Sequence, residues 1–95
     1  MKFITIYVNL ISPTGKPVKG QIIVKDNYAM SLFTDKTLAK KLYEADLAQG
    51  KDVAYNKIHN AYIQRFKGKK AGEIRDILIK EIKKIGGVKF RLEEK

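Results

Sequence analysis

The sequence predicts an α+β domain in which helices pack on one face of a small, mostly antiparallel sheet. Apolar residues alternate with polar or aromatic ones over Phe3–Ile11 and again over Val88–Leu92, as in half-buried strands. Between them, Glu73–Ile85 repeats its apolar residues every three to four positions, which indicates an amphipathic helix. At 95 residues the chain is expected to form one domain spanning residues 1–95.

The N-terminal third of the chain is expected to consist of strands and turns. Phe3–Ile11 has one aliphatic face, and its other face carries two aromatic residues. Two prolines and two glycines in Ser12–Gly20 predict a loop, which leads into the β-branched strand Gln21–Lys25. After the turn signal Asp26-Asn27, Tyr28–Phe33 fits a third strand or the start of a helix. We favour the strand.

Three helices are predicted in the second half of the chain. The first begins at an N-cap, Thr34 or Asp35, and ends near Gln49 before Gly50. The second begins at Asp52 and continues to about Lys67, and the third is Glu73–Ile85, ended by Gly86-Gly87. The last strand is expected to return to the first, which gives the order ββ(β)αααβ.

The charge of the chain points to a polyanionic partner. Twenty Lys and Arg residues face ten Asp and Glu residues, so the formal net charge is +10. Such an excess commonly marks a protein that binds nucleic acid, DNA or RNA, or an acidic protein. The competing interpretation is a solvated basic face, because Lys80, Lys83 and Lys84 also suit the negative end of the third helix.

The strongest candidate site is the basic run that precedes the third helix. It combines four cations with flexible glycines and a helix N-terminus, a setting that suits a phosphate. Most of the cations are Lys, which favours contact with the nucleic-acid backbone over reading of bases. Cations of the hairpin loop and of the last strand extend the predicted binding set to Lys16, Lys19, Arg65, Lys67, Lys69, Lys70, Lys89 and Arg91.

Aromatic residues form a second candidate constellation. Tyr55, His59, Tyr62 and Phe66 would share one stripe of the second helix, which is typical of core residues. The pair Phe3 and Tyr7 on the first strand is better placed to stack unpaired bases, and it also leaves room for a homodimer contact.

His59, the only histidine, raises the alternative of a small metal-independent ribonuclease. Tyr55, Tyr62 and Arg65 would lie within two turns of it on one helix, and together with His59 they include the residue types of a general acid, a general base and a cation. A partly buried structural histidine explains the same pattern. We therefore expect a binding protein without a reaction of its own, and a non-enzymatic modulator of a host or viral protein is the other alternative.

Several chemistries find no support in the sequence. The chain has no cysteine, its carboxylates are scattered, and it carries no Walker, GxGxxG, HExxH or GxSxG motif. No metal and no cofactor are therefore expected. No apolar run approaches 18 residues, and the N-terminal segment reads as a strand rather than a signal peptide, so a cytoplasmic location is expected.

The Ile- and Lys-rich segment Ile74–Ile85, in a chain without Cys or Trp, resembles the small orphan proteins of hyperthermophilic archaea and their viruses. The resemblance is one of composition. It implies a viral or plasmid-borne protein that meets host nucleic acid or a host factor, in the cytoplasm of the host.

Overall fold

The computed structural model describes residues 3–12, 14–85 and 88–94. They form a six-stranded antiparallel sheet with the strand order β4-β5-β3-β2-β1-β6, together with two helices. The α+β class is therefore confirmed, whereas the predicted order ββ(β)αααβ is wrong, because the described chain runs βββαββαβ. The elements are β1 (Ile4–Ile11), β2 (Pro17–Lys25), β3 (Tyr28–Phe33), α1 (Leu38–Ala48), β4 (Val53–Asn56), β5 (Ala61–Arg65), α2 (Ala71–Ile85) and β6 (Lys89–Glu94).

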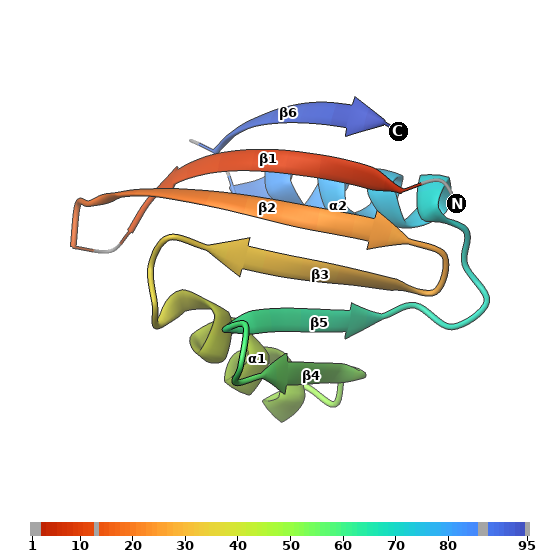
Figure 1. Ribbon diagram of the computed structural model, residues 1–95, viewed down its shortest axis with the longest axis horizontal. Helices are drawn as coiled ribbons and strands as arrows, with labels where there is room; N and C mark the ends of the chain where they lie inside the picture. The colour runs from red at the N-terminus through yellow and green to blue at the C-terminus, as the bar shows by residue number, and fades with distance from the viewer. Residues whose placement is uncertain (1–2, 13, 86–87, 95) are drawn as a thin grey trace.

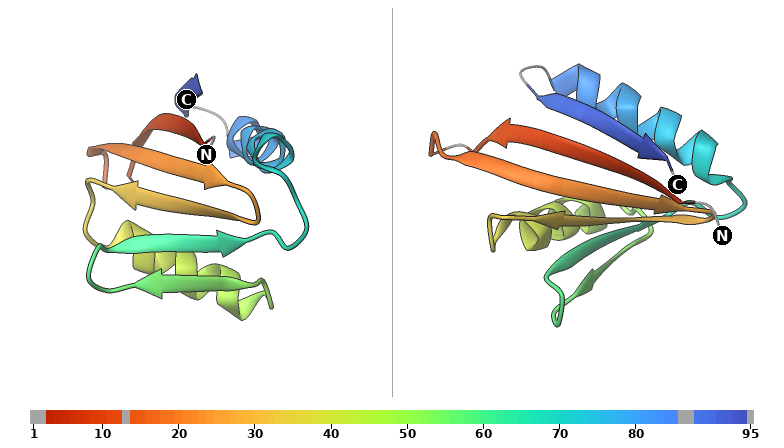
Figure 2. Two further views of the ribbon diagram at one scale, coloured as in Figure 1. Left: turned by 45° about the vertical axis from the view of Figure 1, so that its right-hand side comes forward. Right: turned by 45° about the horizontal axis from the view of Figure 1, so that its top comes forward.

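Both helices cover the same face of the sheet, as Figures 1 and 2 show. The strand register explains this arrangement. Ile6 of β1 lies opposite Ile22 of β2, and Ile22 lies opposite Ser31 of β3. Residues directly opposite one another point to the same face. Helix α2 packs on this face, and the resulting core contains Ile4, Ile6, Val8, Ile22, Val24, Ala29, Ile74, Leu78 and Ile82.

A smaller cluster lies under α1 at the β4 end of the sheet. Ala39 of α1 packs with Val53 of β4 and Tyr62 of β5, and all three are buried. Tyr62 lies opposite Ser31, so this cluster continues the face that α2 covers. Both helices thus lie on one face, and no helix of the described residues covers the other, the open face.

The predicted helix from Asp52 to Lys67 is wrong, because this segment forms the hairpin of β4 and β5. Two asparagines shape its turn. The Asn56 side-chain oxygen accepts hydrogen bonds from the backbone N–H groups of Ile58 and His59 at 2.9 and 3.2 Å. Asn60 has a φ of 50°, a left-handed conformation that asparagine tolerates better than most residues.

Asp52 does not cap a helix, in contrast to the prediction. Its carboxylate lies 3.0 Å from the Arg65 guanidinium, and its backbone oxygen accepts a hydrogen bond from Arg65 N. Asp52 therefore joins the start of the β4 strand to the end of β5.

Other element boundaries differ by a few residues. The strand prediction for Tyr28–Phe33 is confirmed, but the loop Ser12–Gly20 is shorter than predicted, because β2 already begins at Pro17.

Asp35 precedes α1 rather than capping its first residue. Its carboxylate accepts hydrogen bonds from N and Oγ1 of Thr37, both at 2.8 Å, which lowers the pKa of Asp35. The predicted glycine turn at 86–87 lies outside the described residues.

Candidate nucleic-acid interface

The open face of the sheet is formed by the alternate residues that do not face the helices. On β1 these include Thr5, Tyr7 and Asn9, whereas Ile6 and Val8 belong to the core. Three apolar residues at the centre of this face, Ile23, Met30 and Ile63, lie opposite one another and are half-buried. The face therefore combines an apolar centre with polar and charged surroundings.

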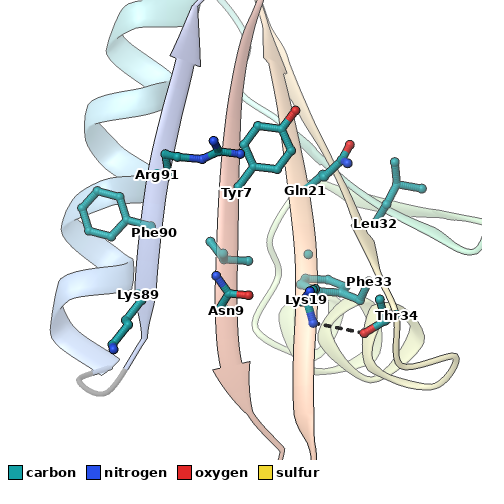
Figure 3. Close-up of a pocket in the computed structure, with 12 residues that line it drawn as sticks. Tyr7, Asn9, Lys19, Gln21, Leu32, Phe33, Thr34, Lys89, Phe90 and Arg91 are labelled. Carbon is teal, nitrogen blue, oxygen red and sulfur yellow. Dashed lines mark hydrogen bonds between the residues drawn. The ribbon is translucent and has the colours of Figure 1, made fainter.

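A groove with a volume of about 720 Å³ crosses β6, β1, β2 and β3 on the open face (Figure 3). Each of β6, β1 and β2 contributes three consecutive residues, and β3 contributes its last two, followed by Thr34. The middle residues of the four sets form a single row: Phe90, Val8, Gly20 and Phe33. Val8, Phe33 and Phe90 of this row direct their side chains toward the helices, and Gly20 has none, so the row contributes backbone to the groove. The residues on either side line the groove on the open face, and they are Tyr7, Asn9, Lys19, Gln21, Leu32, Thr34, Lys89 and Arg91. The Lys89 side chain is directed away from Tyr7, as Figure 3 shows.

The groove is electropositive. It contains Lys19, Lys89 and Arg91, and no carboxylate is among the described residues that line it. All three cations are exposed. The Arg91 guanidinium carbon lies 4.7 Å from the centre of the Tyr7 ring, within the range of a cation–π contact. A hydrogen bond to the nearby Glu93 carboxylate is the main cause of a raised pKa of Tyr7.

Backbone contacts hold the β2–β3 side of the groove in place. Lys19 N donates a hydrogen bond to Thr34 Oγ1 at 3.0 Å, and Thr34 N donates to Lys19 O at 2.9 Å. The reciprocal pair extends the β2–β3 ladder by one residue beyond Phe33. The position of Lys19 along the groove is therefore set by the sheet and not by a free loop.

The basic run at residues 65–70 lies at the other end of the sheet. Arg65 is opposite Tyr28 at the start of β3, whereas Lys19 is bonded to Thr34 beyond its end. At about 3.4 Å per residue, these two positions are about 20 Å apart along the strands. The structure therefore separates the predicted cations into two groups: Lys19, Lys89 and Arg91 in the groove, and Arg65, Lys67, Lys69 and Lys70 at the far end.

The loop of this second group is bound to the β2–β3 turn. Asn27 N donates to Lys69 O at 2.9 Å, and Asn27 O accepts a hydrogen bond from Phe66 N at 2.7 Å. The Asn27 side-chain oxygen accepts a third, from Gly68 N at 3.0 Å. The loop is a structural connection with a fixed backbone.

The start of α2, where the sequence suggested a phosphate, already holds a carboxylate. Ala71 N donates a hydrogen bond to Asp26 Oδ1 at 2.9 Å. Lys70 Nζ lies 3.9 Å from the other oxygen of Asp26, and Lys70 N donates to Glu73 Oε1 at 3.3 Å. Because Asp26 lies 45 residues before Ala71, nothing in the local sequence of the loop revealed this contact.

The residues of the ribonuclease hypothesis do not converge on His59. His59 is exposed in the β4–β5 turn. Tyr55 and Tyr62 pack toward α1, and Arg65 lies at the far end of β5 beside Asp52. The single helix that would have brought them together does not exist.

Lys16 lies in the β1–β2 loop, three residues before Lys19, and is exposed.

Four residues whose side chains line the groove were not among the predicted site residues: Asn9, Gln21, Leu32 and Thr34. Asn9 shares the alternation of Tyr7 on β1, so the sequence carried a signal for its face. Gln21, Leu32 and Thr34 join the groove only through the pairing of β2 with β3, which depends on register.

Metal and membrane chemistry find no site in the described part of the chain. Residues 3–12, 14–85 and 88–94 contain no group of three or more His, Cys, Asp or Glu side chains that could hold an ion. Neither described helix has the length and the apolar character needed to cross a membrane.

Comparison with family models, curated proteins and solved structures gave no match to this chain. The interpretation of the groove therefore depends on its own geometry.

Proposed function

We propose that this protein binds single-stranded nucleic acid in the groove of its open sheet face and performs no reaction on it. Lys19, Lys89 and Arg91 contact phosphates, and Tyr7 contacts a base. The observation that carries the proposal is that three cations, Lys19 of β2 and Lys89 and Arg91 of β6, line one groove together with an aromatic ring, with no carboxylate among the described lining residues.

The cations supply affinity without a sequence code. Each phosphate that a Lys or Arg neutralises releases condensed counterions, which favours binding most at low salt. Lysine, the most frequent cation here, acts as a point charge and suits contact with the backbone. The net charge of +10 adds long-range attraction to any polyanion.

The shape of the site favours a single strand over a duplex. Proteins usually read a duplex by placing a helix or a two-stranded ribbon in the major groove. Here the cations lie on the face of a six-stranded sheet, where an extended strand can lie with its bases against the protein. Exposed aromatic rings on such faces stack unpaired bases, and each stacked base contributes roughly 1–3 kcal/mol.

The test is fluorescence anisotropy of labelled single-stranded DNA, single-stranded RNA and duplex DNA over a range of salt concentrations. The groove variant replaces Lys19, Lys89 and Arg91 with Gln. We expect weaker binding and a log–log salt slope smaller by about 0.7 for each lost phosphate contact of a single strand.

Two matched variants remove the same charge elsewhere. One replaces Lys67, Lys69 and Lys70, and the other replaces the exposed helix residues Lys40, Lys80 and Lys83. Both should retain most of the affinity that the groove variant loses. Equal losses in all three variants would show that binding depends on the total positive charge of the protein and not on the groove. No salt-dependent binding by the natural chain would favour the alternative of an acidic protein partner.

A further inference from the structure

The outer edge of β6 is open to a further strand. Within the described residues, β6 pairs with β1 alone and ends the sheet order. At the opposite edge β4 has four residues, whereas β6 has six. Unpaired N–H and C=O groups along such an edge are a template for pairing with another chain.

The side chains of β6 are complementary to a second copy of the same strand. In an antiparallel pair centred on Arg91, Lys89 of one copy lies opposite Glu93 of the other, and this contact occurs twice. Phe90 lies opposite Leu92, also twice. Residues directly opposite each other point to the same face, so the charged pairs lie on the open face and the apolar pairs on the helix face.

This register is favoured over its neighbours. Centring the pair on Phe90 would place Lys89 opposite Arg91 twice. Centring it on Leu92 would pair Arg91 with Glu93 twice and Leu92 with itself, but Phe90 would lose Leu92 as its apolar partner. Like charges disfavour the first alternative, and the loss of both Phe90–Leu92 pairs disfavours the second. Among the pairs formed by residues 89–93, the unfavourable contact of the chosen register is Arg91 opposite itself at the axis.

The exposure of apolar residues supports contact on the helix face. Helix α2 packs against β1, β2 and β3, and Leu92 remains 40% exposed. Ile85, the last residue of α2, is 73% exposed. A partner strand would cover Leu92 with the Phe90 ring of the second copy.

We infer that two copies of this protein pair through β6 in antiparallel register about Arg91, forming one continuous sheet. A two-fold axis perpendicular to the sheet keeps both open faces on the same side. Each groove is bordered by its own β6, so the grooves adjoin across strands about 4.8 Å apart. If the proposed function holds, one single strand can contact both grooves.

A charge exchange tests this pairing without nucleic acid. Mass in solution is measured by light scattering over a range of concentrations, and the dimer is expected at twice the 10.8 kDa of the chain. Lys89→Glu or Glu93→Lys alone places like charges opposite each other twice, and should raise the dimer dissociation constant about tenfold or more. The double variant Lys89→Glu/Glu93→Lys restores opposite charges and should restore the dimer.

Cross-linking tests the register. The chain has no cysteine, so Arg91→Cys introduces a single thiol at the axis. Directly opposed residues have Cβ atoms about 4.5–5.5 Å apart, close enough for a disulfide after small movement. Under oxidation Arg91→Cys should form a covalent dimer, whereas Lys57→Cys in the β4–β5 turn should not.

A monomer at every concentration, single reversals that leave the dimer intact, or a double variant that stays monomeric would each overturn the pairing. So would absence of the Arg91→Cys cross-link. The two proposals fail separately: a natural chain that stays monomeric and still binds an oligonucleotide overturns the pairing and leaves the proposed function in place. A dimer that binds no oligonucleotide overturns the proposed function alone.

Discussion

Arg91 and Tyr7 are direct partners across β6 and β1, and the guanidinium carbon lies 4.7 Å from the centre of the phenol ring. Both side chains lie in the groove on the open face. The cation–π contact contributes about 0.5–1 kcal/mol at an exposed site. The pair therefore brings an aromatic ring and a positive charge together. In the proposed complex the ring stacks on a base and the guanidinium contacts a phosphate.

Replacing Tyr7 with Leu should weaken binding of single-stranded oligonucleotides. The loss of one stacked base, roughly 1–3 kcal/mol, corresponds to about a 5- to 150-fold weaker affinity. The salt slope should remain nearly unchanged, because no phosphate contact is removed. Anisotropy titrations at several salt concentrations separate the two effects.

Tyr7→Phe is the matched control, since it keeps the ring and removes the hydroxyl. It should bind nearly as well as the natural chain. If Tyr7→Leu also binds like the natural chain, the ring does not stack on a base and the groove acts through charge alone.

A second prediction concerns the packing of Gly20 beneath Phe33. A Cβ atom at position 20 would lie 2.6 Å from Cδ1 of the Phe33 ring and 3.0 Å from Cγ2 of Val8. Both contacts are too short, so Gly20→Ala must displace the ring. We expect a loss of about 1–3 kcal/mol in the free energy of unfolding, the usual cost of overpacking.

Chemical denaturation measures this loss, and Gly72→Ala provides the control. At position 72, in the first turn of α2, the nearest atom to an added Cβ is 3.8 Å away. Alanine also favours a helix over glycine by up to about 1 kcal/mol. A Gly20→Ala protein as stable as Gly72→Ala would show that the Phe33 ring moves away freely.

A third prediction concerns Asp26, which caps α2 from a distant turn. Asp26→Ala leaves the Ala71 N–H without its acceptor and should lower the free energy of unfolding by about 1 kcal/mol, as for other helix caps. Glu44→Ala, on the exposed surface of α1, removes the same charge without a cap. Equal stability of the two variants would contradict the capping role.

Much of the fold follows from periodicity in the sequence. The strands β1 and β6 and the helix α2 were predicted because their alternation or helical spacing is regular, whereas the segment of β3 also fitted the start of a helix. The β4–β5 hairpin was missed because Tyr55, His59, Tyr62 and Phe66 happen to recur at helical spacing. Asn56 and Asn60, which form the turn, were the competing signal.

The candidate site was harder to predict from the sequence than the fold. Lys19, Lys89 and Arg91 were named as binding residues, but only the pairing of β6 with β1 and of β1 with β2 places them in one groove. The loop lysines appeared stronger because they are adjacent in the sequence. Their helix terminus is capped by Asp26, a contact between distant residues that local patterns do not encode.

The fourth prediction concerns Tyr62, whose hydroxyl donates a hydrogen bond to Asp46 Oδ2 beneath α1. Tyr62 is 4% exposed, and Lys51 Nζ lies 3.6 Å from the other oxygen of Asp46. Tyr62→Phe removes the donor, so the partly buried Asp46 carboxylate loses one hydrogen bond. Hydrogen bonds to charged groups contribute about 1.5–3 kcal/mol, and we expect a loss of this size in the free energy of unfolding at neutral pH.

The same contact predicts how this loss depends on pH. Burial, followed by the Asp46 carboxylate, raises the pKa of Tyr62 above its ordinary value of 10.0. The folded state therefore holds the phenol proton more tightly than the unfolded chain does. The stabilising contribution is fully present below pH 10 and decreases as the pH rises above it, because the unfolded chain loses the proton first. The difference in stability between the natural chain and Tyr62→Phe should thus shrink above pH 10 in urea denaturation series. A difference that stays constant from pH 7 to pH 11 would show that the hydroxyl is not held by Asp46 in solution.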